Sequence, residues 1–398
     1  MSLIQMKQAL SLTKIPDSFS ESYESVKDCY MERTEQMLSE ELIINTLKEC
    51  GILGKYLDLI LEAACLLRQK KELRLFLALL SEYINNGGDP RSAEYHPPQG
   101  EGVMYDFLHL FPAIPTMKES VKFLRSRKVP EDIILDTMKE YDTCVQNCEQ
   151  YLGRSAFDHK RLGWIRLLIN NSLIRIGRLK YELPKNRESI IFIRVYQNKH
   201  NETAVFADGV HAHRDGMILG SPGFTDEEQS FFTYISETEE SITGHLIIDG
   251  HIESSKTTLK KNEWTLVLEK TDPVVNIHIP AEGPFDRAHV EDSYQRTREI
   301  LKNCYPDYPY KAFVCSSWLM SRSLRNLLKP TSNILAFQDT FTLFPYPAYG
   351  TGVFSFVFPE QGIPDDYNTL PEKTSLQRAV KKTYLEGGAI LEFSGFFF

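Results

Sequence analysis

Two short apolar segments, one on each side of a segment of helical period, constrain the fold of this chain more than any other feature. They begin at Val274 and Ala312 and are rich in β-branched and aromatic residues, which predicts two strands joined by a helix. Parallel strands connected in this way carry ligands beyond the C-terminal end of the first strand, where the first amides of the helix have no partner. We therefore expect a ligand site at residues 280–285.

The first part of the chain has the pattern of helices and very little else. Apolar residues recur at spacings of three and four, and glycine or asparagine follows several of the segments. The predicted helices span residues 40–50, 55–69, 72–84, from a capping box at 116–119 onwards, 130–151 and 161–176. We expect a helical N-terminal domain of residues 1–155, packed as a bundle with short connections.

Residues 156–398 are predicted as the second domain, and the helix at 161–176 lies at the hinge, so that its domain stays open. Past residue 177 the sequence changes to the period of strands. The predicted strands are 189–197, 203–206, 210–213, 243–249, 251–259, 264–269, 332–344, 352–358 and 389–397. Asp208-Gly209 and Asp249-Gly250 predict hairpin turns, and residues 369–372 predict another helix start. The fold class is therefore α+β: an all-helical domain, then a mixed α/β domain with a mostly antiparallel sheet and a central parallel strand pair.

Charge and hydropathy exclude several classes of partner. The 398 residues carry a formal net charge of -9, and the basic residues form no block, so a nucleic-acid surface is not expected. The longest apolar run, residues 56–67, holds two acids and is too short for a bilayer, and no leader opens the chain. Seven scattered cysteines without a Cys-x-x-Cys pair fit reduced thiols. We expect a cytoplasmic protein without a membrane partner.

Two polar side chains interrupt the first central strand. Alternation places Asn276 and His278 on one face, although a strand covered on both faces is normally apolar. Either the two residues form a hydrogen-bonded pair within the core, or His278 lines a cleft, where an imidazole suits proton transfer. The sequence leaves both interpretations open.

The turn into the following helix holds the second group of candidates. Asp286 fits the N-cap position, Gly283 allows a ligand close to the backbone, and the first amides of a helix bind phosphate oxygens. An ordinary helix start has the same features, and the carboxylates of Glu282 and Asp286 oppose a bare phosphate site. A ligand site and a plain helix entry both remain open here.

Other reactive side chains have simpler explanations. Cys315 is an isolated cysteine in an apolar strand and is expected to be an inert core thiol. The neighbouring serines lack the Gly-x-Ser-x-Gly turn of a hydrolase. His211 and His213 share a strand face, but without a further ligand at a telling spacing they are expected to be solvated, and we predict no metal site.

Four strings of residues resemble a bacterial two-domain acyltransferase-like family, which joins a helical N-terminal domain to a GNAT-like C-terminal domain. They are Ile277-His278-Ile279-Pro280, Phe313-Val314-Cys315-Ser316-Ser317-Trp318-Leu319, Ser332-Asn333-Ile334 and Leu370-Pro371-Glu372-Lys373-Thr374-Ser375-Leu376-Gln377-Arg378-Ala379. The resemblance covers nearly the whole chain.

The resemblance implies that the turn and helix after residue 279 bind the pyrophosphate of acyl-CoA, such as acetyl-CoA, and that the next strand splays away to admit the pantetheine arm. It implies His278 or Glu282 as the catalytic base and the backbone near Ile279 as a donor to the thioester carbonyl. The implied cofactor-binding residues are Ile279, Gly283, Pro284, Phe285, Asp286 and Arg287. The usual Gln/Arg-x-x-Gly-x-Gly/Ala signature is absent, and residues 280–285 stand in its place.

Two functions follow from these observations. The first is a CoA-dependent N-acyltransferase in which an amine of a small molecule or peptide attacks the thioester directly, without a metal. The second is a non-catalytic ligand-binding or interaction protein that retains the GNAT-like fold. The polar face at Asn276 and His278 favours the enzyme, and the missing signature favours the binding protein. The oligomeric state does not follow from the sequence.

Overall fold

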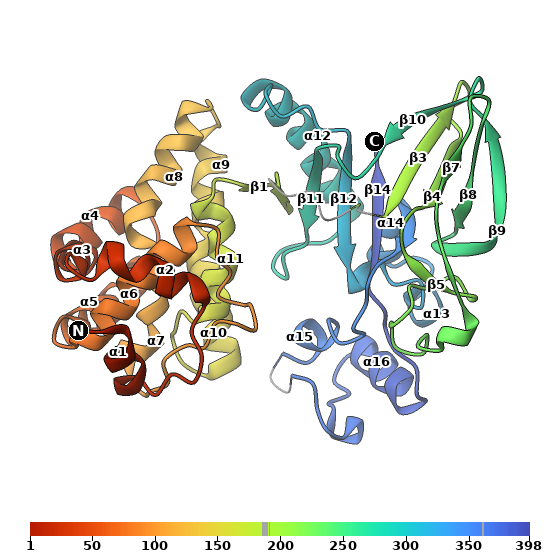
Figure 1. Cartoon of the computed structure of the whole chain (residues 1–398). Helices are drawn as coiled ribbons and strands as arrows, with labels where there is room; N and C mark the ends of the chain where they lie inside the picture. Colours follow the sequence, from red (N-terminus) through yellow and green to blue (C-terminus); the bar gives the residue numbers. More distant parts are fainter. Residues whose placement is uncertain (185–189, 191, 360–361) are drawn as a thin grey trace. The chain divides into compact units, whose positions relative to one another are not determined.

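Contacts within the chain divide it into two compact units, Met1–Ile176 and Gly177–Phe398 (Figure 1). The structure is a computed structural model, and it describes residues 1–184, 190, 192–359 and 362–398. Across these described residues, no helix is both long and apolar enough to cross a lipid bilayer. The division into domains after residue 155 stays a prediction.

The first unit consists of helices and one terminal strand. They are α1 (Leu3–Ala9), α2 (Asp17–Val26), α3 (Tyr30–Met37), α4 (Glu40–Cys50), α5 (Leu57–Arg68), α6 (Lys71–Asn85), α7 (Val103–Asp106), α8 (Ile114–Ser126), α9 (Glu131–Met138), α10 (Glu140–Leu152), α11 (His159–Ile169) and β1 (Leu173–Ile176). Helix α6 packs against α1, α2, α3 and α5, and all its residues from Leu73 to Leu80 are buried. The buried Arg74 donates to Thr34 Oγ1 at 2.8 Å and pairs with Glu35 at 3.0 Å, which compensates its charge.

The helix ends show which local signals are reliable. Helices α4 and α10 end at Gly51 and Gly153, both at φ 67°, a left-handed conformation that favours glycine, so the predicted glycine stops are confirmed. The helix start predicted from the capping box at residues 116–119 was wrong, because α8 begins at Ile114. The helix predicted to reach residue 176 ends at Ile169 instead. Asn171 is left-handed at φ 55°, and a β-branched strand follows it.

The second unit holds most of the strands. Its elements are β2 (Leu179–Glu182), β3 (Ile193–Asn198), β4 (Thr203–Ala207), β5 (His211–His213), β6 (Ser230–Phe232), β7 (Ser236–Glu237), β8 (Ser241–Ile248), β9 (His251–Lys260), β10 (Trp264–Leu268), β11 (Val274–His278), α12 (Arg287–Cys304), β12 (Ala312–Ser317), α13 (Leu324–Leu327), α14 (Asn333–Gln338), β13 (Thr342–Pro345), α15 (Phe354–Val357), α16 (Ser375–Leu385) and β14 (Phe393–Phe397). Residues 189 and 191 of the predicted strand 189–197 lie outside the described residues.

Two sheets form the body of this unit. In the first sheet the strand order is β2-β11-β12-β14-β13, and β11 and β12 are the parallel pair. In the second sheet the order is β10-β3-β4-β8-β7, with β9 paired to β8, and all described pairings are antiparallel. The predicted fold class is confirmed: a helical region precedes mostly antiparallel sheets that contain one parallel pair.

The first sheet lies between α12 and the second sheet (Figure 1). On the helix side, Tyr181 and Ser293 hydrogen-bond at 2.8 Å through their hydroxyls, and the rings of Tyr294 and Phe313 lie 6.4 Å apart. On the other side, Val274 and Val314 belong to a buried cluster with apolar residues of β3, β4 and β10. The first sheet therefore has a covered face on each side, as the apolar composition of its central strands predicts.

Three predictions for this unit were wrong. Asp208-Gly209 joins two sheets and not a hairpin, because β4 pairs with β3 and β8 while β5 pairs with β6. Where the chain leaves the second sheet after β4, the Asp208 carboxylate accepts from the amide of Ile235 at 3.2 Å. The strand predicted over 332–344 is α14 followed by β13, with Ser332 capping α14, and the strand predicted over 352–358 contains α15.

The helix start predicted at residues 369–372 was also misplaced. Helix α16 begins at Ser375, and the capping box is formed by Thr374 and Gln377. The amide of Gln377 donates to Thr374 Oγ1 at 3.1 Å, and the amide of Thr374 donates to Gln377 Oε1 at 3.2 Å. Both sets of residues have the spacing of a capping box, so spacing alone does not distinguish them.

Candidate functional site

The two parallel strands part at their C-terminal ends. The described pairing of β11 with β12 runs from Val274 to Asn276, where Asn276 lies opposite Val314. Beyond that point β11 continues against β2 as far as His278, and β12 continues against β14 as far as Ser317. Different neighbours therefore hold the two strand ends. We call the region between residues 277–278 of β11 and 315–317 of β12 the wedge. Strand ends that part in this way suit an extended ligand, because its amides can pair with strand backbone.

Polar side chains gather on one face beside this wedge. Paired residues of a sheet share a face, and the register places Asn276 opposite Glu182 and His278 opposite Lys180. This is also the face on which Val274 and Val314 join the buried cluster with the second sheet. The face therefore changes from apolar to polar along β11, at the point where β12 leaves it.

His278 is held by a carboxylate. Its Nε2 lies 2.8 Å from Glu182 Oε2, and the side chains are 32% and 16% exposed, respectively. In the neutral ring, Nε2–H donates to the carboxylate, so the basic lone pair is on Nδ1. The sequence analysis identified His278 but not Glu182. Lys180 and Glu182 alternate with apolar residues, and this alternation could have predicted β2 and its polar face.

Glu282, the other predicted base, has a different surrounding. It is exposed in the loop after β11, and its Oε1 lies 3.9 Å from Nζ of the buried Lys180. Lys180 in turn lies opposite His278 in the β2–β11 register. The structure thus brings both predicted bases to one strand end, with Glu182 beside His278 and Lys180 beside Glu282.

The side chain of Arg178 contacts the loop of residues 279–286 at two places. The buried guanidinium donates from Nη2 to the carbonyl of Pro280 at 2.8 Å and stacks 5.0 Å from the ring centre of Phe285. Phe285 also packs on Phe337 of α14, with ring centres 5.2 Å apart. Gly283 has φ 88°, so the backbone conformation itself favours glycine there. A hydrogen bond at Pro280 and ring contacts at Phe285 therefore hold the two ends of the loop.

At the start of α12, Asp286 acts as the helix cap. Its carboxylate accepts from the amide of His289 at 3.1 Å, and the ring of His289 contacts the same carboxylate. The hydrogen bond from His289 lowers the pKa of Asp286, so this carboxylate is ionised at neutral pH. A negative charge therefore stands at the helix end where a phosphate would bind.

The remaining predicted cofactor residues lie along the same loop and first turn. Ile279 is half-buried, Pro284 is exposed, and exposed Arg287 pairs with Glu291 at 2.6 Å. All of the predicted site residues thus lie in one continuous segment. That they bind CoA stays a prediction.

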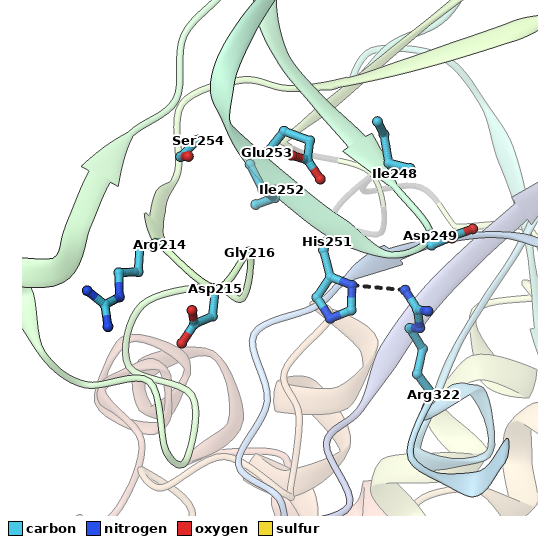
Figure 2. A pocket seen from close by; sticks show the side chains of 10 residues that line it. All are labelled: Arg214, Asp215, Gly216, Ile248, Asp249, His251, Ile252, Glu253, Ser254 and Arg322. Carbon is cyan, nitrogen blue, oxygen red and sulfur yellow. Dashed lines mark hydrogen bonds between the residues drawn. The ribbon is translucent and has the colours of Figure 1, made fainter. Parts of the chain in front are cut away.

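A cavity of about 470 Å³ lies elsewhere in the second unit, and sequence reasoning missed it (Figure 2). Residues of the β8–β9 hairpin, the loop after β5 and the segment after β12 line it. Its charged and titratable lining residues are Arg214, Asp215, Asp249, His251, Glu253 and Arg322. His251 Nδ1 accepts from Arg322 Nη1 at 2.9 Å. Burial, followed by the charge of Arg322, lowers the pKa of His251, so its ring is neutral at pH 7.

The structure also places the cysteine and the two strand histidines that the sequence singled out. Cys315 is buried, and burial raises the pKa of its thiol to about 12, as expected for a core cysteine. His211 is exposed, but His213 is buried against Phe224, so its prediction as a solvated residue was wrong. Among the described residues, no group of three or more histidine, cysteine or acidic side chains is placed to hold a metal ion.

Comparison with solved structures identifies similar folds. An acyltransferase in complex with decanoyl-CoA and teicoplanin shares 17% identity with a TM-score of 0.63, covering 100% of this chain and 99% of that chain. An acyltransferase in complex with decanoyl-CoA shares 17% identity with a TM-score of 0.61, and one in complex with CoA and 10C-teicoplanin shares 16% with a TM-score of 0.62, at the same coverage. At these identities the likeness shows the fold alone.

Comparison with curated proteins finds no match. A family model does match: the GNAT-like C-terminal domain aligns with residues 173–397, which is more than half of the chain and includes β11, α12 and β12. The matched range also contains the His278–Glu182 pair and the loop of residues 279–286. The chain therefore belongs to the family of the GNAT-like C-terminal domain.

Proposed function

We propose that this protein is a CoA-dependent N-acyltransferase, which transfers an acyl group from acyl-CoA to an amine of a small molecule or peptide. The parting of β11 and β12 beside the His278–Glu182 pair carries the proposal. A strand wedge suits the extended pantetheine arm of the donor, and an imidazole oriented by a carboxylate suits removal of an amine proton. Supporting this reading, the solved structures of similar fold are acyltransferases with acyl-CoA or CoA bound.

In the proposed reaction, the amine nitrogen attacks the thioester carbonyl without a covalent enzyme intermediate. The C–N bond forms, the C–S bond breaks, and the electron pair of the broken bond leaves with the CoA thiolate. His278 Nδ1 takes the proton that the amine loses, and the negative charge of Glu182 stabilises the resulting imidazolium. A backbone amide near Ile279 is the proposed donor to the carbonyl oxygen. Glu282 is the alternative base, and the acid that protonates the thiolate is unassigned.

The loop of residues 279–286 and the first turn of α12 are the proposed contacts for the CoA pyrophosphate. Arg178 would hold this loop in place for the cosubstrate, because it contacts both Pro280 and Phe285. That the protein is cytoplasmic and of bacterial origin stays a prediction from the sequence.

Titration with CoA, acetyl-CoA, octanoyl-CoA and decanoyl-CoA, followed by thermal unfolding, tests the proposal. A ligand at a hundred times its Kd is expected to stabilise the folded protein by about 2.7 kcal/mol. A shift with the acyl-CoAs that is reproduced in calorimetry supports the enzyme. If none of the four ligands shifts the transition or releases heat, the enzyme reading fails. The non-catalytic binding protein, which the missing signature favours, then becomes the better account.

Removing the charge of Asp286 is expected to tighten CoA binding. Asparagine is an equally good helix cap, so Asp286→Asn keeps α12 while removing a carboxylate next to the proposed pyrophosphate position. We expect the Kd for CoA to fall about two- to five-fold at low salt and the gain to shrink as salt is added. Calorimetry at two salt concentrations measures both effects.

Asp158 provides a matched control, because its carboxylate also caps a helix by accepting from the amide of Arg161 at 2.9 Å. Asp158→Asn in the first unit should leave CoA affinity unchanged. If CoA binds but Asp286→Asn weakens binding or has no effect, its phosphates do not approach the start of α12.

A further inference from the structure

A tight turn and a close backbone contact form two walls of the cavity shown in Figure 2. The β8–β9 turn is made by Asp249 and Gly250, both with positive φ, at 49° and 75°. Gly216 lies directly on β9: its carbonyl accepts from the amide of Ile252 at 2.9 Å, and a Cβ at this position would be only 2.7 Å from His251 Cβ. This backbone contact positions the loop after β5 as one wall of the cavity.

The lining combines both signs of charge. Arg214 and Arg322 are cationic, while Asp215, Asp249 and Glu253 are anionic. Three carboxylates repel a ligand that carries only negative charge, so the phosphate-rich part of CoA does not suit this cavity. A ligand with separate positive and negative groups can pair with both sets.

His251 contributes a neutral donor to the same cavity. Since the guanidinium of Arg322 only donates, His251 Nδ1 must accept its hydrogen bond, and Nε2 carries the proton. The lowered pKa of His251 keeps this tautomer neutral at pH 7. The half-buried His251 and Arg322 are therefore fixed relative to each other, with donor groups suited to a carboxylate.

The cavity lies near the edge of the first sheet at which β11 and β12 part. A Cβ added to Gly250 would lie 3.1 Å from the ring of Phe393 and 3.3 Å from Arg322 Cδ. Phe393 is paired with Ser317 at the end of β12. With strands about 4.8 Å apart, β14 is separated from β11 by two spacings, or about 10 Å. An acceptor held here therefore needs an extended side chain to bring an amine to the wedge.

We propose that this cavity binds the acceptor, and that the acceptor is an amino acid whose α-ammonium and α-carboxylate groups are held here while a side-chain amine reaches the wedge. The carboxylate of the acceptor pairs with Arg322 and with Nε2–H of His251, and its ammonium group pairs with Glu253. The side-chain amine is the one acylated, so the charged end is an anchor and takes no part in bond formation. This assignment rests on the proposed N-acyltransferase function.

Binding of four probes to the full chain, without acyl-CoA, tests the anchor. L-lysine and L-norleucine share the zwitterionic end, norleucine amide lacks the carboxylate, and cadaverine lacks the zwitterionic end altogether. We expect L-lysine and L-norleucine to bind in calorimetry or ligand-observed NMR, and norleucine amide and cadaverine to bind at least about ten-fold more weakly. Equal binding of L-norleucine and its amide, or no binding of either amino acid up to about 10 mM, overturns the assignment.

Variants locate the site. Arg322→Gln and Glu253→Gln should each weaken L-norleucine binding about ten-fold or more, and in turnover assays should raise KM for L-lysine while KM for acyl-CoA stays unchanged. Arg325→Gln, an exposed arginine three residues away that pairs with Asp339, is the matched control. Glu253 is exposed, so its variant is expected to fold even if Arg322→Gln does not. Unchanged affinity in Glu253→Gln and in any folded Arg322→Gln contradicts the site.

A parallel titration with decanoyl-CoA separates this inference from the proposed function. If decanoyl-CoA binds and the amino acids do not, the cavity assignment fails while the enzyme proposal stands. If the amino acids bind and no acyl-CoA binds, the enzyme proposal fails, and with it the acceptor role, while the zwitterion site itself remains.

Discussion

Replacing His278 with alanine is expected to lower kcat by about 10²- to 10⁴-fold, the usual contribution of a positioned general base. The imidazole takes a proton only as the amine attacks, so its loss affects the transition state and not ground-state binding of the donor. KM for acyl-CoA and the Kd of CoA should therefore change little. Steady-state kinetics with an amine acceptor, together with calorimetry, measure both quantities.

Glu182→Gln distinguishes a positioning role from a structural one. Without the carboxylate, the imidazolium that forms during proton transfer is no longer stabilised, so kcat should fall while KM for acyl-CoA and the melting temperature stay close to the wild-type values. A purely structural residue would lower the melting temperature together with activity. His200→Ala, in an exposed turn of the same unit, is the control for histidine loss.

Unchanged turnover in both His278→Ala and Glu282→Gln would remove both base assignments.

Acidification from pH 7 to pH 5 is expected to destabilise the first unit by about 2 kcal/mol through His109 alone. This histidine is fully enclosed, with Nε2 2.8 Å from the hydroxyl of Tyr95, and burial lowers its pKa to about 3. In the unfolded chain its pKa is the ordinary 6.5. Between these two values the unfolded state binds a proton that the folded state does not, so stability falls as pH decreases from 6.5 towards 3.

Urea unfolding of the full chain at several pH values measures this dependence, and His109→Gln is the test variant. Glutamine can accept the Tyr95 hydroxyl but does not titrate, so the pH slope should decrease by about one proton between pH 6 and pH 4. His96→Gln, which removes a more exposed histidine of the same unit, should keep the wild-type slope. An unchanged slope in His109→Gln would show that His109 already takes up a proton in the folded state.

The fold could be predicted where local pattern and packing agree. The β11–α12–β12 unit followed from its apolar runs, because strands covered on both faces and a helix with one buried stripe leave distinct periods in the sequence. Residues 332–344 were misassigned because their apolar side chains fill a core cluster from a short helix. In such a short apolar segment, tertiary packing decides between helix and strand.

The candidate site could be predicted only in part, because much of it is set by register. His278 was visible as a polar residue in an apolar strand, but its partner Glu182 is 96 positions away and is brought to it by the pairing of β2 with β11. Arg178 reaches the loop in the same way. The cavity at His251 and Arg322 depends on a glycine contact and a turn from separate segments, which no single stretch of sequence reveals.

Hydrogen exchange with and without decanoyl-CoA tests the central claim most directly, because it reports where the donor binds on the backbone. If the pantetheine arm enters between β11 and β12, amides of residues 277–287 and 315–320 should exchange more slowly in the complex. The β8–β9 turn, assigned to the acceptor, should be unaffected until L-lysine is added. Binding in calorimetry without protection of residues 277–287 and 315–320 would contradict the account.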